Sequence, residues 1–187
     1  CPMSKIAADM ENFDWQMLSP MLARHASGLC AMSQVGHIEE LSELDPGRVP
    51  TFLRYLQQHF KFVVVDGLRD FSDHALAAMD VADRIVLVLT QDVAAIRGAR
   101  MRLDLLQRLC YGADKFCILL NRYDKKNKLT LEYVGEALGR PVSITVPNDF
   151  RLVHESITLG RTLRQVNPQA RVSRAVDIAA RAALDLP

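Results

Sequence analysis

The chain has 187 residues, of which 49% are apolar and 24% charged, and its 23 basic residues nearly balance 22 acidic ones. This composition excludes a disordered or collagen-like chain, and the length suits one globular domain, so we expect residues 1–187 to form a single domain. The near-neutral net charge gives no reason to expect nucleic acid as a partner.

The sequence contains no segment that predicts secretion or membrane insertion. No apolar run approaches the roughly 20 residues that a membrane-spanning helix needs, and no basic stretch precedes an apolar run at the N-terminus. The four cysteines form no C-x-x-C pair and no cluster with metal-binding spacing, which favours a reducing compartment. We therefore expect a cytoplasmic protein.

The first predicted elements are a helix and a short strand. Asp14 can cap a helix over residues 14–25 that carries an apolar face on one side. Gly28 ends this helix, and residues 29–33 read as a strand. A loop over residues 36–43 follows.

A second helix and the most apolar strand come next. Asp45-Pro46 opens the helix, whose buried stripe is predicted to be Val49, Phe52, Leu53 and Leu56. Residues 62–66 are apolar on both faces of the predicted strand, which is typical of a buried parallel sheet.

The rest of the chain alternates between helices and short apolar strands. Strands are predicted over residues 85–89, 116–120 and 142–146, and helices over 72–81, 92–110, 130–138, 149–158 and 168–184. Such alternation implies right-handed crossovers, so we expect an α/β fold with a doubly wound, mostly parallel sheet and helices on both faces. Sheets of this kind bind ligands beyond the carboxyl ends of their strands.

Asp66 is the first candidate site residue, because it is an acid that directly follows an apolar strand. In P-loop ATPases this arrangement is the Walker B motif, in which the carboxylate holds Mg²⁺. Taken alone, an acid at a strand end is more often a turn former or a helix cap.

Polar residues also follow two later strands. Asn121 and Arg122 come after the strand over residues 116–120, where an amide can donate to and accept from the edge of a flat heterocycle. Pro147, Asn148 and Asp149 follow the strand over residues 142–146, where Pro147 makes the turn rigid. Asn121 can equally serve the turn itself, and Asn148 or Asp149 can simply cap the next helix.

The order of these strand ends resembles the MinD/ParA family of deviant Walker ATPases. The resemblance rests on residues 62–66, 82–88, 119–124 and 146–149, in that order and with similar intervals. Residues 22–29, 65–69, 77–83 and 155–160 are similar to the CpaE/TadZ branch of that family. The resemblance covers the chain from about residue 10 to its end.

The resemblance implies a P-loop NTPase fold with ATP and Mg²⁺ as cofactors of the intact family. It implies that Asp66 is the Walker B acid and metal ligand, that Asn121 and Arg122 lie near the adenine, and that Pro147, Asn148 and Asp149 close over the base. Members of the branch help to position and assemble the secretion machinery of Flp-type (tight-adherence) pili. The implied partners are pilus assembly proteins and a second copy in a homodimer, with peripheral association at the inner face of the cytoplasmic membrane or the cell pole.

The chain departs from the family in its phosphate-binding loop. The family's loop has the pattern K-G-G-x-G-K-[ST], whose backbone N–H groups cradle phosphates, and residues 1–187 contain no G-x-x-x-x-G-K. The sequence therefore predicts no catalytic residue, and the first strand of the family's sheet is missing too. That strand normally lies in the middle of the sheet, so its slot must be filled, left as exposed edges or supplied by another chain.

Two hypotheses account for this departure, and a third belongs to another class. The chain is either part of a normal ATPase, which the joint retention of Asp66, Asn121 and Pro147 favours, or a degenerate scaffold that does not hydrolyse ATP. The third hypothesis is a phospho-accepting receiver domain that uses Asp66, Thr90 and Lys115. It is disfavoured because Lys115 precedes its strand and would lie at the opposite edge of the sheet.

Overall fold

The structure is a computed structural model that describes residues 14–32 and 45–184. The chain divides into two compact units, residues 1–82 and residues 83–187, and each unit is described by itself. The predicted loop over residues 36–43 lies outside the described residues.

The first helix of the described residues is much shorter than predicted. α2 spans Trp15–Leu18 and continues as a 3₁₀ turn, η2, over Ser19–Met21. Asp14 is the N-cap, as predicted, and its carboxylate accepts a hydrogen bond from the Met17 N–H at 2.8 Å. The prediction of a helix to residue 25 is wrong because Pro20 has no N–H to continue the α-helical ladder.

A small hairpin follows η2. β1 (Ala23–Arg24) pairs antiparallel with β2 (Cys30–Ala31), and the turn between them contains Gly28 at a φ of 90°, a backbone conformation that favours glycine. The strand predicted over residues 29–33 is thus present, but within the described residues it comprises only Cys30 and Ala31.

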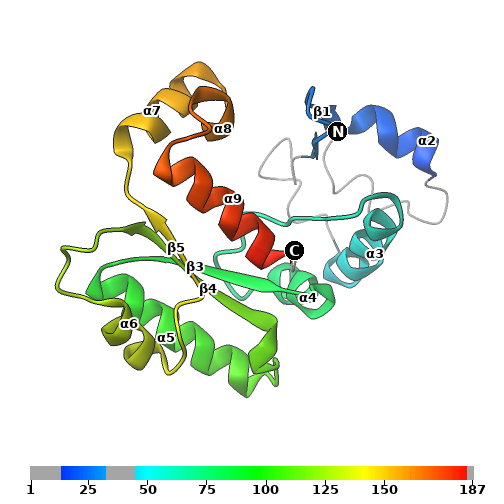
Figure 1. Cartoon of the computed structure of the whole chain (residues 1–187). Coiled ribbons are helices and arrows are strands. Elements are labelled where there is room, and N and C mark those ends of the chain that lie inside the picture. Colours follow the sequence, from blue (N-terminus) through cyan, green and yellow to red (C-terminus); the bar gives the residue numbers. More distant parts are fainter. Residues whose placement is uncertain (1–13, 33–44, 185–187) are drawn as a thin grey trace. The chain divides into compact units, whose positions relative to one another are not determined.

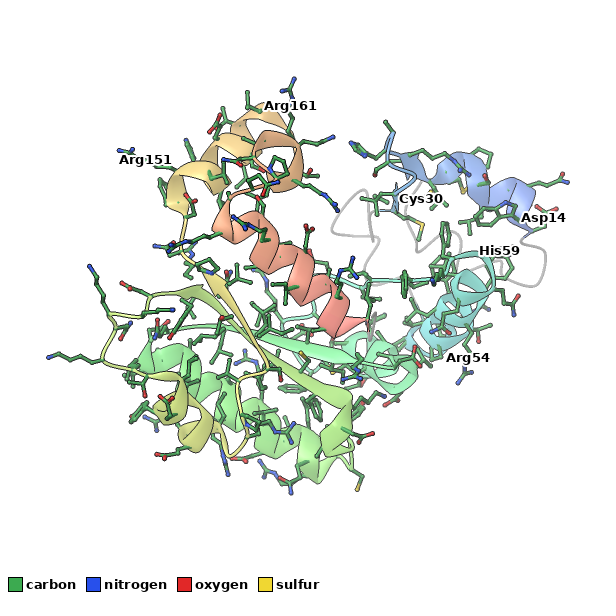
Figure 2. The ribbon with its side chains drawn as sticks, viewed as in Figure 1. Asp14, Cys30, Arg54, His59, Arg151 and Arg161 are labelled. Atoms are coloured by element: carbon green, nitrogen blue, oxygen red, sulfur yellow. The ribbon has the colours of Figure 1, made fainter. Side chains whose placement is uncertain are left out.

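The core of the first unit is built from α3 and α4. The 3₁₀ turn η4 (Pro46–Arg48), capped by Asp45, leads into α3 (Val49–His59), and all four residues of its predicted stripe are buried. α4 (Asp73–Val81) is capped by Ser72 and contributes Ala78 to the same cluster. His59, at the end of α3, stacks on Trp15 with 4.3 Å between the ring centroids (Figure 2).

The predicted strand over residues 62–66 is not a strand in the structure. This segment is extended, but within the described residues it pairs with no other strand. Val64 and Val65 are open to solvent, 78% and 45% exposed, whereas Val63 is half-buried against the core of the first unit. The prediction failed because an apolar run becomes a strand only where a neighbouring strand completes its hydrogen bonds.

The second unit is organised around a parallel sheet. β3 (Ile85–Thr90), β4 (Phe116–Tyr123) and β5 (Ile144–Pro147) pair in that order, and both pairings are parallel (Figure 1). The three predicted strands are therefore confirmed, although β4 continues three residues further than predicted.

Helices cover both faces of this sheet (Figure 1). α5 (Val93–Arg108) and α6 (Leu131–Leu138) pack on one face, in a cluster that includes Leu103, Ile118 and Leu120. α9 (Arg171–Ala183) packs on the other face, where Val172 and Ala179 join the side chains of Cys117 and Ile144. Alternate residues of β4 thus enter opposite clusters, as expected for a strand buried on both faces.

The prediction for α5 fails only at its C-terminal end. Ile96, Ala99, Leu103 and Leu106 are buried, but Cys110, where the predicted helix was to end, lies beyond α5, is exposed and has a φ of 65°. Arg100 and Asp104 form an ion pair at 3.0 Å on the outer side of the helix.

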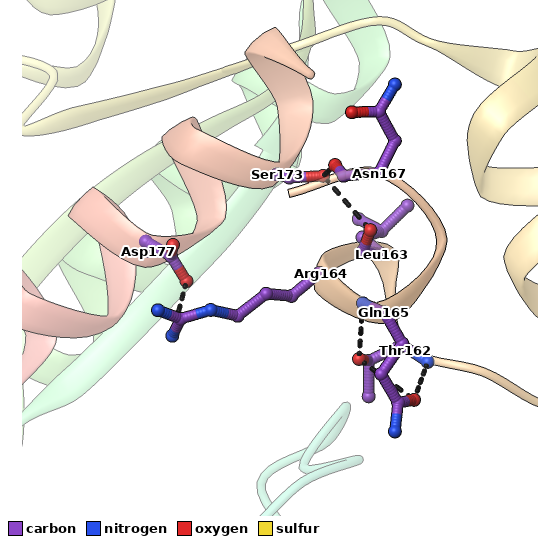
Figure 3. A network of polar contacts seen from close by, with 7 residues as sticks. All are labelled: Thr162, Leu163, Arg164, Gln165, Asn167, Ser173 and Asp177. Atoms are coloured by element: carbon purple, nitrogen blue, oxygen red, sulfur yellow. Dashed lines mark hydrogen bonds and ion pairs between the residues drawn. The ribbon is translucent and has the colours of Figure 1, made fainter. Parts of the chain in front are cut away.

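The connection from β5 to α9 contains the predicted helix α7 and a second, shorter helix, α8, that the sequence did not predict. α7 (Phe150–Leu159) is followed by α8 (Leu163–Val166), whose N-cap Thr162 and Gln165 form a capping box (Figure 3). The buried Ser173 hydroxyl donates to the Asn167 carbonyl at 2.6 Å, and Arg164 pairs with Asp177 at 3.7 Å. These contacts fasten α8 to α9.

α7 itself has little packing. Ser156 is its only buried residue, while Phe150 and Ile157 are 71% and 73% exposed. Arg151 and Arg161 point outward near its two ends (Figure 2). Among the described residues, no helix is both long enough and apolar enough to cross a membrane.

Candidate functional site

The carboxyl ends of β4 and β5 bring five of the six predicted site residues together. In the parallel register Thr90 of β3 lies beside Asn121, and Tyr123 lies beside Pro147. Asn121 and Arg122 are therefore one strand away from the turn that contains Asn148 and Asp149. The sixth residue, Asp66, is exposed in the first unit and is described with that unit.

Arg122 occupies a strained position at this edge. Its φ of 53° places it in the left-handed region, which costs a non-glycine residue about 1–2 kcal/mol. The strain coincides with a break in the β4–β5 register between Leu120 and Tyr123. Irregularities of this kind re-aim side chains and occur often next to binding sites.

The Asn121 amide is partly used by the strand itself. Its Oδ1 accepts a hydrogen bond from the Arg122 N–H at 2.9 Å, which identifies the other terminal atom as the Nδ2 donor. Nδ2 makes no hydrogen bond to any residue in the described part of the chain. The sequence predicted that this amide would both donate and accept toward a base, whereas the structure leaves mainly its donor available.

The turn after β5 is fixed to β4 and to α7. The Asn148 N–H donates to the Tyr123 carbonyl at 3.2 Å, which joins the two strand ends. Asp149 caps α7, because its Oδ1 accepts from the Leu152 N–H at 3.1 Å. The capping role that the sequence left open for Asp149 is therefore confirmed, and Asn148 remains exposed at the edge.

Gln91 is a residue of this region that the sequence did not single out. It is only 8% exposed, and its side chain joins the turn after β3 to the loop after β4. Gln91 Nε2 donates to the Leu129 carbonyl at 2.7 Å, and its Oε1 accepts from the Asp124 N–H at 2.9 Å. No periodicity distinguishes a buried glutamine at a strand end from an exposed one, so only the folded arrangement reveals it.

The charges around the edge are mostly positive. Arg122, Lys125, Lys126 and Lys128 are all exposed, and they outnumber the acid Asp124 in the same loop. Thr90 and the Ala95 N–H donate to Asp92, and these hydrogen bonds lower the pKa of its carboxyl below the ordinary value. Asp92 is therefore the ionised N-cap of α5 at neutral pH.

A metal site of protein ligands alone does not appear in the described residues, which contain no group of three or more His, Cys, Asp or Glu side chains that could hold an ion. An open hollow runs along α6, and residues such as Leu131, Gly135 and Val142 line it. None of the predicted site residues contributes to this hollow, so it gives no support to a second location for the site.

Comparisons with known proteins place the fold. No family model matches the chain. The septum site-determining protein MinD of Thermotoga maritima is 23% identical over 135 residues, which cover 70% of this chain and 49% of that protein. The match thus spans about half the length of the curated relative.

Solved structures match over nearly the whole chain. A ParA family ATPase from Chlorobium tepidum gives a TM-score of 0.86 at 21% identity, covering 96% of this chain and 75% of that one. MinD from Pyrococcus horikoshii, solved in complex with Mg-ADP, gives a TM-score of 0.69 at 15% identity, covering 94% of this chain and 70% of that one. The chain therefore has the α/β fold of the MinD/ParA P-loop ATPases, with a parallel sheet between helices, as the sequence predicted.

Proposed function

We propose that this chain provides the base-binding side of an ATP site of the ParA/MinD type. The observation that carries the proposal is the convergence of Asn121, Arg122 and the Pro147–Asp149 turn at the carboxyl ends of two parallel strands. The strained backbone of Arg122 and the available Asn121 amide suit a flat, polar ligand. Adenine is the base that the resemblance implies.

The phosphate side of the site needs a glycine-rich loop that residues 1–187 do not contain. Asp66 would hold Mg²⁺, and a glycine-rich loop would cradle the phosphates. Part of a larger ATPase is our preferred reading, because a scaffold that had abandoned nucleotide would not need to retain Asp66 together with Asn121 and Pro147.

The biological role that we propose is the positioning and assembly of an Flp-type pilus machine in the manner of CpaE/TadZ proteins. This rests on the sequence resemblance of residues 65–69, 77–83 and 155–160. The protein would act in the cytoplasm at the inner membrane or cell pole, as a homodimer with pilus assembly proteins as partners. The exposed apolar side of α7, with Phe150 and Ile157, supports a protein contact.

Calorimetric titration of the chain with ATP and with adenosine monophosphate tests the nucleotide proposal. A base-binding side without a phosphate cradle predicts weak binding, near 1 mM or about −4 kcal/mol, for both ligands alike. Mg²⁺ should change neither affinity much. Asn121→Ala should abolish the heat of binding, and Gln58→Ala, an exposed change on α3, should leave it unchanged.

Either of two results would overturn parts of the proposal. The absence of adenosine monophosphate binding at saturating concentrations would remove the base site. Micromolar binding of ATP that depends on Mg²⁺ would show that residues 1–187 already contain a phosphate-binding loop. The pilus role is tested separately, by deleting the gene and scoring surface pili, and normal piliation would contradict it.

A further inference from the structure

Gln91 lies at the centre of a hydrogen-bonded network that the nucleotide proposal does not use. Its side-chain amide forms hydrogen bonds with Asp124 and Leu129, at the two ends of the loop over residues 124–129. Its backbone carbonyl accepts a hydrogen bond from Asn127 Nδ2 at 3.1 Å. Asn127 in turn accepts from the Leu129 N–H at 3.0 Å. Two side chains thus satisfy backbone groups of a loop that has no helix or strand of its own.

The position of Gln91 in the chain links this loop to the strand edge. Thr90, which precedes it, pairs with Asn121, and Asp92, which follows it, caps α5. The loop begins at Asp124, directly after the end of β4 at Tyr123. We call the strand ends at Asn121, Arg122 and residues 147–149 the base-binding edge. A glutamine buried at this point therefore connects that edge to the junction of β3 and α5.

We propose that Gln91 is a positioning residue that holds the loop over residues 124–129 in the shape required for base binding beside Asn121. This inference rests on the proposed nucleotide site, because Gln91 acts through the loop and touches no base itself. An amide fits the role at neutral pH, since one atom must donate to a carbonyl while the other accepts from an N–H.

The structural part of the inference has a direct measurement that needs no ligand. In Gln91→Met the shape of the side chain is kept, but the Asp124 N–H and the Leu129 carbonyl lose their partners. Amide hydrogen exchange at Asp124 should then accelerate about tenfold or more, as expected when a buried bond is lost. Gln107→Glu, an exposed change on α5, should leave this exchange rate unchanged.

A second variant separates the geometry of the bonds from mere packing. In Gln91→Glu an ionised carboxylate faces the Leu129 carbonyl and repels it, whereas the protonated acid can donate to it as the amide does. The repulsion should loosen the Leu129 end of the loop, so protection of the Leu129 N–H should return as the pH falls through the raised pKa of the introduced buried carboxyl. The charged groups around it are Asp92, Asp124 and Lys125, Lys126 and Lys128, so the wild-type chain is measured at each pH as the reference.

The functional part is read from adenosine monophosphate binding to the same variants. Gln91→Met should weaken it about tenfold, and Gln91→Glu should weaken it at neutral pH and recover at low pH. Asn127→Ala loosens the loop from its other side and should weaken binding as well, even if the Gln91 variants fail to fold.

Failure of this inference can be told apart from failure of the nucleotide proposal. If the wild-type chain binds no nucleotide, the nucleotide proposal fails, and hydrogen exchange still decides whether Gln91 orders the loop. Unchanged exchange at Asp124 in Gln91→Met would overturn the inference. So would a loosened loop that binds adenosine monophosphate with wild-type affinity.

Discussion

Two apolar segments of similar composition, residues 62–66 and Ile85–Thr90, differ in their strand pairing. The second is β3, which pairs with β4 over six residues and buries Leu89 to 6% exposure. The first is extended with Val64 78% exposed, and no strand of the described residues pairs with it. The difference shows that apolar side chains do not create a strand unless a neighbour completes the backbone hydrogen bonds.

The comparison also bears on how the nucleotide site is assembled. The strand ends that would contact the base lie within one compact unit, whose sheet is complete from β3 to β5. Asp66 ends the unpaired segment. We therefore expect the base side of the proposed site to be formed within the second unit.

The largest effect is expected from Phe52→Ala in the first unit. Phe52 is 1% exposed in the core of α3, so its removal should destabilise that unit by about 3–5 kcal/mol. Trp15, the only tryptophan, packs against this core and reports its unfolding in urea by fluorescence. Arg54→Ala, an exposed change on α3, is the control. Equal urea midpoints for the two variants would show that the first unit has no core of its own.

The paired and unpaired segments can be compared directly through Leu120→Ala and Val64→Ala. Leu120 is fully buried in β4, so the first change should cost about 2–5 kcal/mol. Val64 is largely exposed, and the second change should stay within about 0.5 kcal/mol. Both values come from urea unfolding followed by circular dichroism, and a large cost for Val64→Ala would mean that its segment is buried.

A smaller effect of opposite sign is expected from Arg122→Gly. Glycine adopts a φ of 53° without strain, although its freedom in the unfolded chain offsets part of the gain. The free energy of unfolding of the variant should be up to about 1 kcal/mol higher than that of the wild type. Its affinity for adenosine monophosphate should be lower. Stabilisation with unchanged binding would show that the strain serves no ligand.

The smallest effect concerns the α5 cap and depends on pH. Because the fold lowers the pKa of Asp92, its ionised form stabilises the folded state above the ordinary value of 3.8, and this contribution is lost as the pH falls through the lowered pKa. The difference in Tm between the wild type and Asp92→Ala should therefore be constant near neutral pH and shrink in acid. A difference that is the same at pH 7 and in strong acid would exclude the ionised cap.

Local signals explain which elements could be predicted from the sequence. The caps at Asp14 and Asp149 could be predicted, because each carboxylate accepts from a backbone N–H three residues away. Partner-dependent features were not predictable: the segment ending at Asp66 pairs with no strand of the described residues, and the exposed Cys110 depends on where α5 ends.

The candidate site was predictable only in part. The positions of Asn121 and Pro147 followed from the rule that parallel strands present their carboxyl ends together. The hydrogen bond that occupies the Asn121 oxygen and the burial of Gln91 depend on backbone geometry that no spacing encodes.

The most direct test of the base-binding edge is a nuclear magnetic resonance titration of the ¹⁵N-labelled chain with adenosine monophosphate. Our account predicts concentration-dependent shifts of the amide signals of residues 121–124, 148 and 149, with none at the residues of 131–140 along the α6 hollow. Shifts centred on that hollow, or no shifts at the strand ends when the ligand exceeds about 10 mM, an affinity weaker than about −3 kcal/mol, would contradict it.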